Sequence, residues 1–116
     1  MARFTVTIRR RGKTERQRHE TLGGALVALE ARLDELGRSE RRDTERALRR
    51  TLEPVQQVAV RGEVAGPRGL RGGVDVRGDG SAEAYTGRWR RVLVERRKGE
   101  SAYEALARVL SDSWPE

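Results

Sequence analysis

Cysteine is absent from this chain of 116 residues, and histidine occurs only once, at His19. Without cysteine the protein forms neither a disulfide framework nor a thiolate zinc site. A lone histidine cannot complete a common zinc site, and the sequence places no carboxylate to orient His19 as a general base. We therefore expect no metal ion and no cofactor.

Long apolar runs are missing as well. No segment approaches the ~20 consecutive apolar residues that a membrane-spanning helix needs. The opening sequence MARFTVTIRR lacks the apolar stretch of about 7–15 residues that marks a secretory signal. We expect a cytoplasmic protein that does not enter a membrane.

Familiar catalytic motifs are also lacking. None of the patterns GxSxG, HExxH, GxxxxGK(S/T) or GxGxxG occurs. The carboxylates Asp75, Asp79 and Glu83 fall in one predicted hairpin, where ion pairing or solubility is their ordinary role. The sequence predicts no catalytic residue, and we expect a protein that is not an enzyme.

Apolar side chains are scarce, at 35% of residues, whereas charged side chains make up 37%. Soluble domains average roughly 45–50% apolar and 25% charged residues, so this core is built from few side chains. The length fits one small basic domain spanning residues 1–116. So thin a core also suggests that a partner or a second copy completes it.

Positive charge is in excess: the net charge is +7, and 23 of the 25 basic residues are arginine. A GC-rich genome explains arginine in place of lysine, but not the excess of positive over negative charge. A polyanion partner explains the excess, because a positive field attracts nucleic acid and a guanidinium forks onto phosphate. The charge is concentrated in residues 1–18, 41–50 and 88–98, with net charges of +6, +3 and +5.

Several segments have the pattern of β-strands, with apolar and polar residues alternating along the chain. In the first, Phe4, Val6 and Ile8 point to one side. A turn at Gly12 follows. The expected strands are residues 3–9, a polar edge strand at 14–18, residues 54–66, and a hairpin over 74–85 that turns at 78–80.

Helical spacing begins after the first hairpin. Leucines four and three apart over residues 22–36 predict a helix that is capped by Thr21 and ended by Gly37. A second, arginine-rich helix is expected from Ser39 to Pro54. Its apolar face is poor, so its arginines either face solvent or contact phosphate.

The last part of the chain is ambiguous until residue 100. We interpret residues 86–98 as a helix in preference to a strand, although Val92 and Val94 favour a strand. The final helix begins at Ser101, which forms a capping box with Glu104. Together the elements predict an α+β fold: a mostly antiparallel sheet of four to five strands with two helical hairpins packed against it.

The function expected from this pattern is that of a non-enzymatic basic module, which contacts the nucleic-acid backbone without strong sequence specificity. Stacking on bases is not expected, because Phe4, Trp89 and Tyr103 are assigned to the core, which leaves only Tyr85 and Trp114 free. The candidate binding residues are Arg9, Arg10, Arg11, Lys13, Arg42, Arg46, Arg49, Arg50, Arg68, Arg71, Arg90, Arg91, Arg97 and Lys98.

The alternative is a protein-interaction or assembly subunit, homodimers included, that binds an acidic protein surface. The sequence leaves both functions open, and it does not distinguish DNA from RNA.

Overall fold

A computed structural model of the chain describes residues 3–48 and 58–114, with side chains over 3–43 and 58–114. One sheet in the order β2–β1–β3–β4–β5–β6, antiparallel throughout, packs against two helices. The strands are β1 (Phe4–Arg10), β2 (Lys13–His19), β3 (Val58–Ala65), β4 (Arg71–Arg77), β5 (Ala82–Thr86) and β6 (Val92–Leu93). The helices are α1 (Leu22–Leu48) and α2 (Ala102–Ser113), and the 3-10 turn η1 (Pro67–Gly69) joins β3 to β4.

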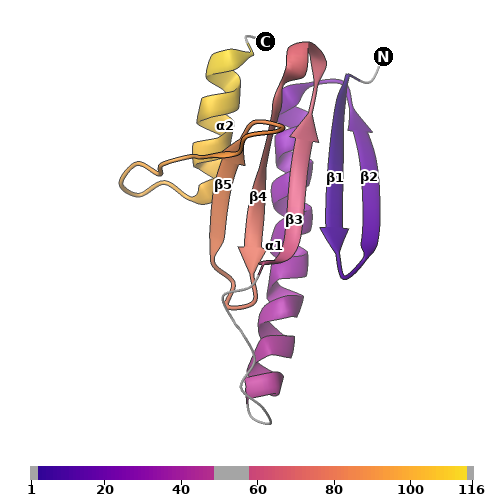
Figure 1. Cartoon of the computed structure of the whole chain (residues 1–116), viewed down its shortest axis with the longest axis vertical. Helices are drawn as coiled ribbons and strands as arrows, with labels where there is room; N and C mark the ends of the chain where they lie inside the picture. Colours follow the sequence, from indigo (N-terminus) through magenta and orange to yellow (C-terminus); the bar gives the residue numbers. More distant parts are fainter. Residues whose placement is uncertain (1–2, 49–57, 115–116) are drawn as a thin grey trace.

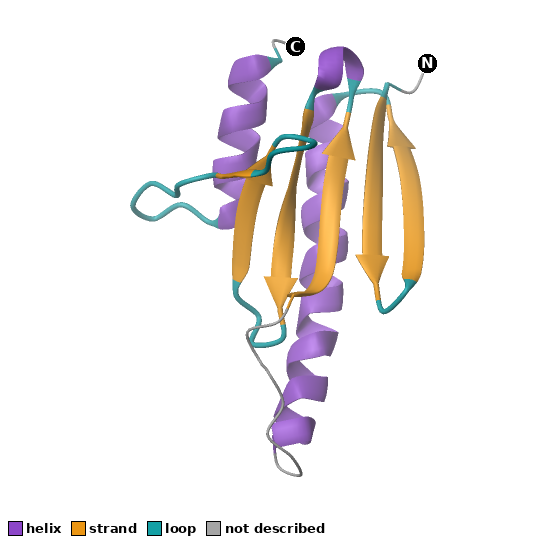
Figure 2. Ribbon diagram, in the orientation of Figure 1, coloured by secondary structure: helices purple, strands orange, loops and turns teal. Residues whose placement is uncertain are grey.

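Both helices lie on the same face of the sheet (Figure 1). After β2, α1 crosses this face and returns the chain to β3, on the far side of β1. α1 contacts β1 and β3, whereas α2 contacts β4 and β5. The opposite side of the sheet, which we call the open face, carries no helix (Figure 2).

The core lies between the sheet and the helices. Phe4, Val6 and Ile8 of β1 are buried, as their alternation predicts. Four of the five leucines of the α1 stripe are buried with them, and Leu26 is half-buried. Each such side chain stabilises the fold by about 1.5–3 kcal/mol when it is fully buried.

Two strand glycines let the helices approach the sheet closely. A Cβ atom on Gly62 of β3 would overlap the side chains of Leu29 and Leu33 on α1. A Cβ on Gly72 of β4 would press on Leu106 of α2 in the same way. Each helix therefore sits over a strand position that has no side chain.

The predicted break between two helices at Gly37 and Ser39 is wrong, since α1 runs without interruption from Leu22 to Leu48. Gly37 is buried, and a Cβ there would lie only 3.2 Å from Val76 Cγ1. The glycine thus allows a close helix–sheet contact rather than ending the helix. The start at Thr21 is confirmed, because its Oγ1 accepts a hydrogen bond from the Gly24 backbone N–H. The predicted end at Pro54 lies outside the described residues.

The predicted helix over 86–98 is also wrong. This segment is mostly irregular and contributes the two-residue strand β6, so the sheet has six strands rather than four or five. The Val94 N–H donates to the Ala84 carbonyl, which draws the segment onto the edge of β5. With α1 unbroken and this helix absent, two helices replace the two helical hairpins. The capping box of Ser101 and Glu104 on α2 is confirmed.

Candidate nucleic-acid interface

A hollow of about 380 Å³ opens at the end of the sheet where β1 turns into β2 and β3 begins. We call it the cationic hollow, because five of its lining residues are basic and none is acidic. The basic residues are Arg9, Arg10, Arg11, Lys13 and Arg61. A concave surface lined by one sign of charge concentrates the opposite charge, so the hollow is suited to an anion.

The turn that forms the rim of the hollow is tight. Arg10 pairs with Lys13, which leaves Arg11 and Gly12 as the two turn residues, with φ of 49° and 77°. Positive φ at both positions is what a type I′ hairpin turn requires. Glycine adopts this conformation freely, but arginine does so at a cost. Contacts to α1 offset that cost.

Those contacts come from the second half of α1. Arg10 Nε donates to Glu40 Oε1 at 2.7 Å, and Arg11 Nη2 lies 3.1 Å from Glu40 Oε2 and 3.3 Å from Asp43 Oδ2. Glu40 is buried, and the guanidinium groups of Arg10 and Arg11 supply the positive charge that a buried carboxylate needs. Arg9 and Lys13, in contrast, make no ion pair with any described residue.

The charge of Arg9 continues along the open face of β1 and β2. By strand alternation and register, Arg16 and Arg18 share this face, beside Thr7 and Thr5. Both arginines are exposed and form no ion pair within the described residues. The one acidic residue of β2, Glu15, points to the other face and pairs with Arg32 of α1. Three like charges thus lie on adjacent strands without a counter-charge, which is unfavourable unless an anion binds.

The other half of the open face is neutralised. Three ion pairs cross its strands: Arg61 with Asp75, Arg71 with Glu63, and Arg77 with Glu83. The first joins residues directly opposite in the register of β3 and β4, and Glu83 lies diagonal to Arg77. Among the strands of the open face, free positive charge is therefore confined to β1 and β2.

Residues 87–99, which we call the arginine loop, join β5 to α2 (Figure 2). The first part of the loop turns over the open face, and the last part projects beyond the β5 edge of the sheet. Beneath the loop, Tyr85 is only 1% exposed, and its hydroxyl donates to Glu63 Oε2 at 2.7 Å. The guanidinium of Arg91 lies over the Tyr85 ring, 4.7 Å from its centre. Burial, followed by the bond to Glu63, raises the pKa of Tyr85. This polar cluster fastens the loop to the sheet.

The aromatic assignments made from sequence are largely reversed. Trp89 of the arginine loop is 90% exposed, although it was expected in the core. Tyr85 and Trp114, expected to be free, are buried. Trp114 stacks edge-on against Phe4, whose predicted burial is confirmed. Tyr103 is half-buried against the core.

The structure divides the predicted binding residues between two ends of the sheet, about 20 Å apart along a seven-residue strand. The hollow holds Arg9, Arg10, Arg11 and Lys13, and Arg42 is exposed on the adjoining part of α1. At the opposite end lie Arg68, Arg71, Arg90 and Arg91, whereas Arg97 and Lys98 follow β6, which runs back along the edge of β5. The Arg46 side chain, Arg49 and Arg50 lie outside what the structure describes.

Arg10, Arg11 and Arg71 are already paired with carboxylates, and Arg91 covers Tyr85. Arg68 lies over Trp114. Sequence reasoning missed Arg16, Arg18 and Arg61. The alternation of residues 13–19 would have placed the first two on one face, but only the strand register aligns them with Arg9.

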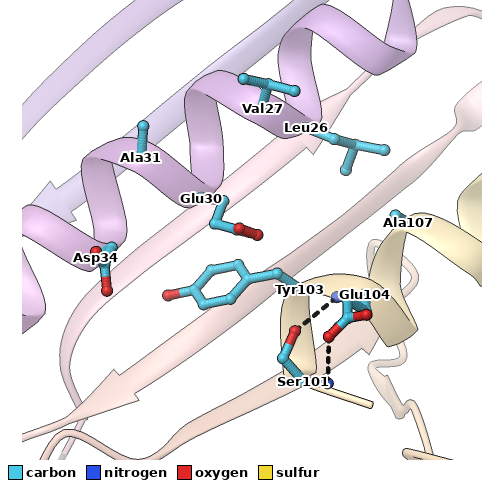
Figure 3. Close-up of a pocket in the computed structure, with 9 residues that line it drawn as sticks. All are labelled: Leu26, Val27, Glu30, Ala31, Asp34, Ser101, Tyr103, Glu104 and Ala107. Carbon is cyan, nitrogen blue, oxygen red and sulfur yellow. Dashed lines mark hydrogen bonds between the residues drawn. The ribbon is translucent and has the colours of Figure 1, made fainter.

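The helix side of the molecule has the opposite character. A groove of about 690 Å³ runs between α1 and α2, and we call it the helix groove (Figure 3). Its lining includes the carboxylates of Glu30, Asp34 and Glu104, and no basic residue. Tyr103 reaches from α2 toward α1, and its pKa is raised to about 12 by burial and by the neighbouring Asp34 and Glu30. The groove itself therefore carries negative charge.

Over the described residues no group of histidine and acidic side chains is arranged to hold a metal ion. No helix there is both long and apolar enough to cross a membrane. The chain matches no protein family, no curated protein and no solved structure. The class of protein therefore rests on the fold: an α+β domain with a basic strand pair on the open face and a carboxylate-lined groove between the helices.

Proposed function

We propose that the protein is a non-enzymatic module that binds the sugar–phosphate backbone of nucleic acid, without strong sequence specificity, through the cationic hollow and the open face of β1 and β2. The observation that carries the proposal is the row of Arg9, Arg16 and Arg18. These three arginines have no counter-charge among the described residues, while every acidic side chain on the strands of the open face is paired.

Backbone binding follows from the chemistry of this surface. Guanidinium groups bind phosphate oxygens and release the counterions condensed on the nucleic acid, whatever its sequence. The strands present arginine and threonine there, and neither β1 nor β2 presents a ring for base stacking. The carboxylates of the helix groove favour an orientation in which the open face meets the nucleic acid.

Charge reversal at one arginine tests the proposal. Arg9→Glu should weaken binding of a labelled random-sequence duplex and lower the slope of log affinity against log salt by about 0.9 or more. Fluorescence anisotropy over a salt series measures both quantities. The matched control is Arg38→Glu, which makes the same change in net charge at an exposed position of α1, away from the open face.

The proposal predicts that the control keeps the wild-type salt slope. Equal losses in the two variants would show that only net charge matters, and a wild-type protein that binds no duplex at low salt would remove the function altogether.

A further inference from the structure

Two surfaces outside the nucleic-acid interface expose large apolar side chains. In the arginine loop, Trp89 is almost fully exposed, and Val92 and Leu93 are 59% and 64% exposed. In the helix groove, Val27 is 72% exposed. These are four of the five exposed large apolar side chains in the described parts of the chain. Apolar side chains gathered on a surface mark a site of interaction.

The two surfaces carry opposite charge. The arginine loop contains six basic residues and a single acidic one, Glu95. The helix groove is lined by three carboxylates together with the apolar side chains of Leu26 and Val27 and the ring of Tyr103. Each surface therefore combines apolar contact area with a charge that complements the other.

We infer that the arginine loop of one copy of the chain docks in the helix groove of a second copy, with Trp89 lying between α1 and α2. Within a single molecule, Trp89 is exposed on the arginine loop, whose first part turns over the open face, whereas the groove lies on the helix side (Figures 1 and 3). The carboxylates of the groove exclude nucleic acid as its occupant. They attract instead the arginines that flank Trp89, and an indole ring beside a guanidinium suits such a mixed surface.

When one loop fills one groove the contact is head-to-tail, and the pair as a whole keeps one free loop on one copy and one free groove on the other. A single loop buries less than a standard interface of roughly 1,200–2,000 Å², so the association is weak and concentration-dependent. The inference is independent of nucleic-acid binding.

Self-association is measured on nuclease-treated protein that is free of nucleic acid, by sedimentation velocity from about 10 µM to about 1 mM, the range for a small interface. The weight-average mass should rise with concentration. Tryptophan emission should shift to shorter wavelength in parallel, because Trp89 leaves water while Trp114 is buried already.

Two variants separate the partners of the contact. Trp89→Ala removes the loop anchor, and Glu30→Lys reverses a groove charge; each should weaken self-association roughly tenfold or more. Glu35→Lys is the matched control for the groove, because it makes the same charge change on an exposed part of α1 outside the groove lining. It should self-associate like the wild type.

Mixing supplies the sharpest test. The Trp89→Ala variant keeps an intact groove and the Glu30→Lys variant an intact loop, so the mixture should form a one-to-one pair and grow no further. A wild type that stays monomeric at the highest concentration overturns the inference. So does self-association that survives both variants, or a mixture of the two that stays monomeric.

Discussion

At the scale of the residue, Tyr85 organises the open face. Its hydroxyl donates to the buried Glu63, and its ring packs over Gly73, where a Cβ would collide with it. Arg91 closes the cluster from above. Tyr85 is therefore as well buried as the core residues, although it lies on the side of the sheet away from the helices. Its contact with Arg91 holds the arginine loop against the sheet.

Both tyrosines should ionise late in the folded protein. Burial raises the pKa of Tyr103 from 10.0 to about 12, and that of Tyr85 is raised as well. Because the folded values lie above the unfolded one, the stabilisation is complete below pH 10.0 and is lost as the pH rises from 10.0 to about 12. Phenolate absorbance measured at pH 10.0 should be weak in native protein and strong in urea. Equal phenolate absorbance in native and urea-unfolded protein would contradict the prediction, because it would mean that the tyrosine hydroxyls are exposed to water in the folded state.

At the scale of the element, the arginine loop is held at its far end by α2. Arg108 Nε donates to Glu100 Oε2 at 2.9 Å, and its Nη2 donates to the Glu95 carbonyl at 3.1 Å. Glu100 Oε1 also accepts the Arg97 N–H at 2.9 Å. The Arg108 bonds, with the Arg97 N–H, lower the pKa of Glu100 from 4.5 to about 2.

Glu100→Gln should lower the melting temperature at neutral pH by removing the charge from these bonds. Since the folded pKa of Glu100 lies below the unfolded one, its contribution is complete above pH 4.5 and is lost between 4.5 and about 2. The gap between wild type and variant in thermal melts should therefore close over that range. Glu95→Gln, in the same loop and without an ion pair among the described residues, is the control. A gap of constant size in acid would contradict the assigned role.

At the scale of the whole molecule, one core joins both helices to the sheet. The buried apolar cluster includes Leu29 and Leu33 of α1 together with Leu106 and Leu110 of α2. With so few apolar residues in the chain, no second cluster of similar size is available to either helix. The two helices should therefore unfold together, in a single transition.

Leu29→Ala tests whether the two helices share one core and unfold in a single transition. Removing a fully buried leucine should cost about 2–5 kcal/mol, whereas Val27→Ala on the exposed side of the same helix should stay within about 0.5 kcal/mol. Urea unfolding followed by circular dichroism and by tryptophan fluorescence measures both changes; the fluorescence change comes chiefly from buried Trp114, because Trp89 is exposed already. Separate transitions by the two probes, or an unchanged midpoint for Leu29→Ala, would rule out a shared core.

Strand and helix positions were predictable wherever a local period was strong. The alternation around Val6, the leucine stripe of α1 and the capping box at Ser101 all reappear in the structure. The helix break at Gly37 and the helix over 86–98 failed for one reason: contacts with distant strands outweighed local preference. Gly37 lies against the side chain of Val76 on β4, so the helix continues through it. The Val94 N–H donates to the Ala84 carbonyl on β5, which holds that segment extended.

Periodicity and charge are local properties, so the α+β composition, the thin core and the surplus of arginine could all be predicted before any fold was known. Which arginines lack a counter-charge depends instead on how the strands pair. Arg61, Arg71 and Arg77 are matched to carboxylates by the pairing of β3, β4 and β5, while Arg9, Arg16 and Arg18 meet none on β1 and β2. Strand register decides which arginine lies beside which carboxylate, and register depends on residues far apart in the chain.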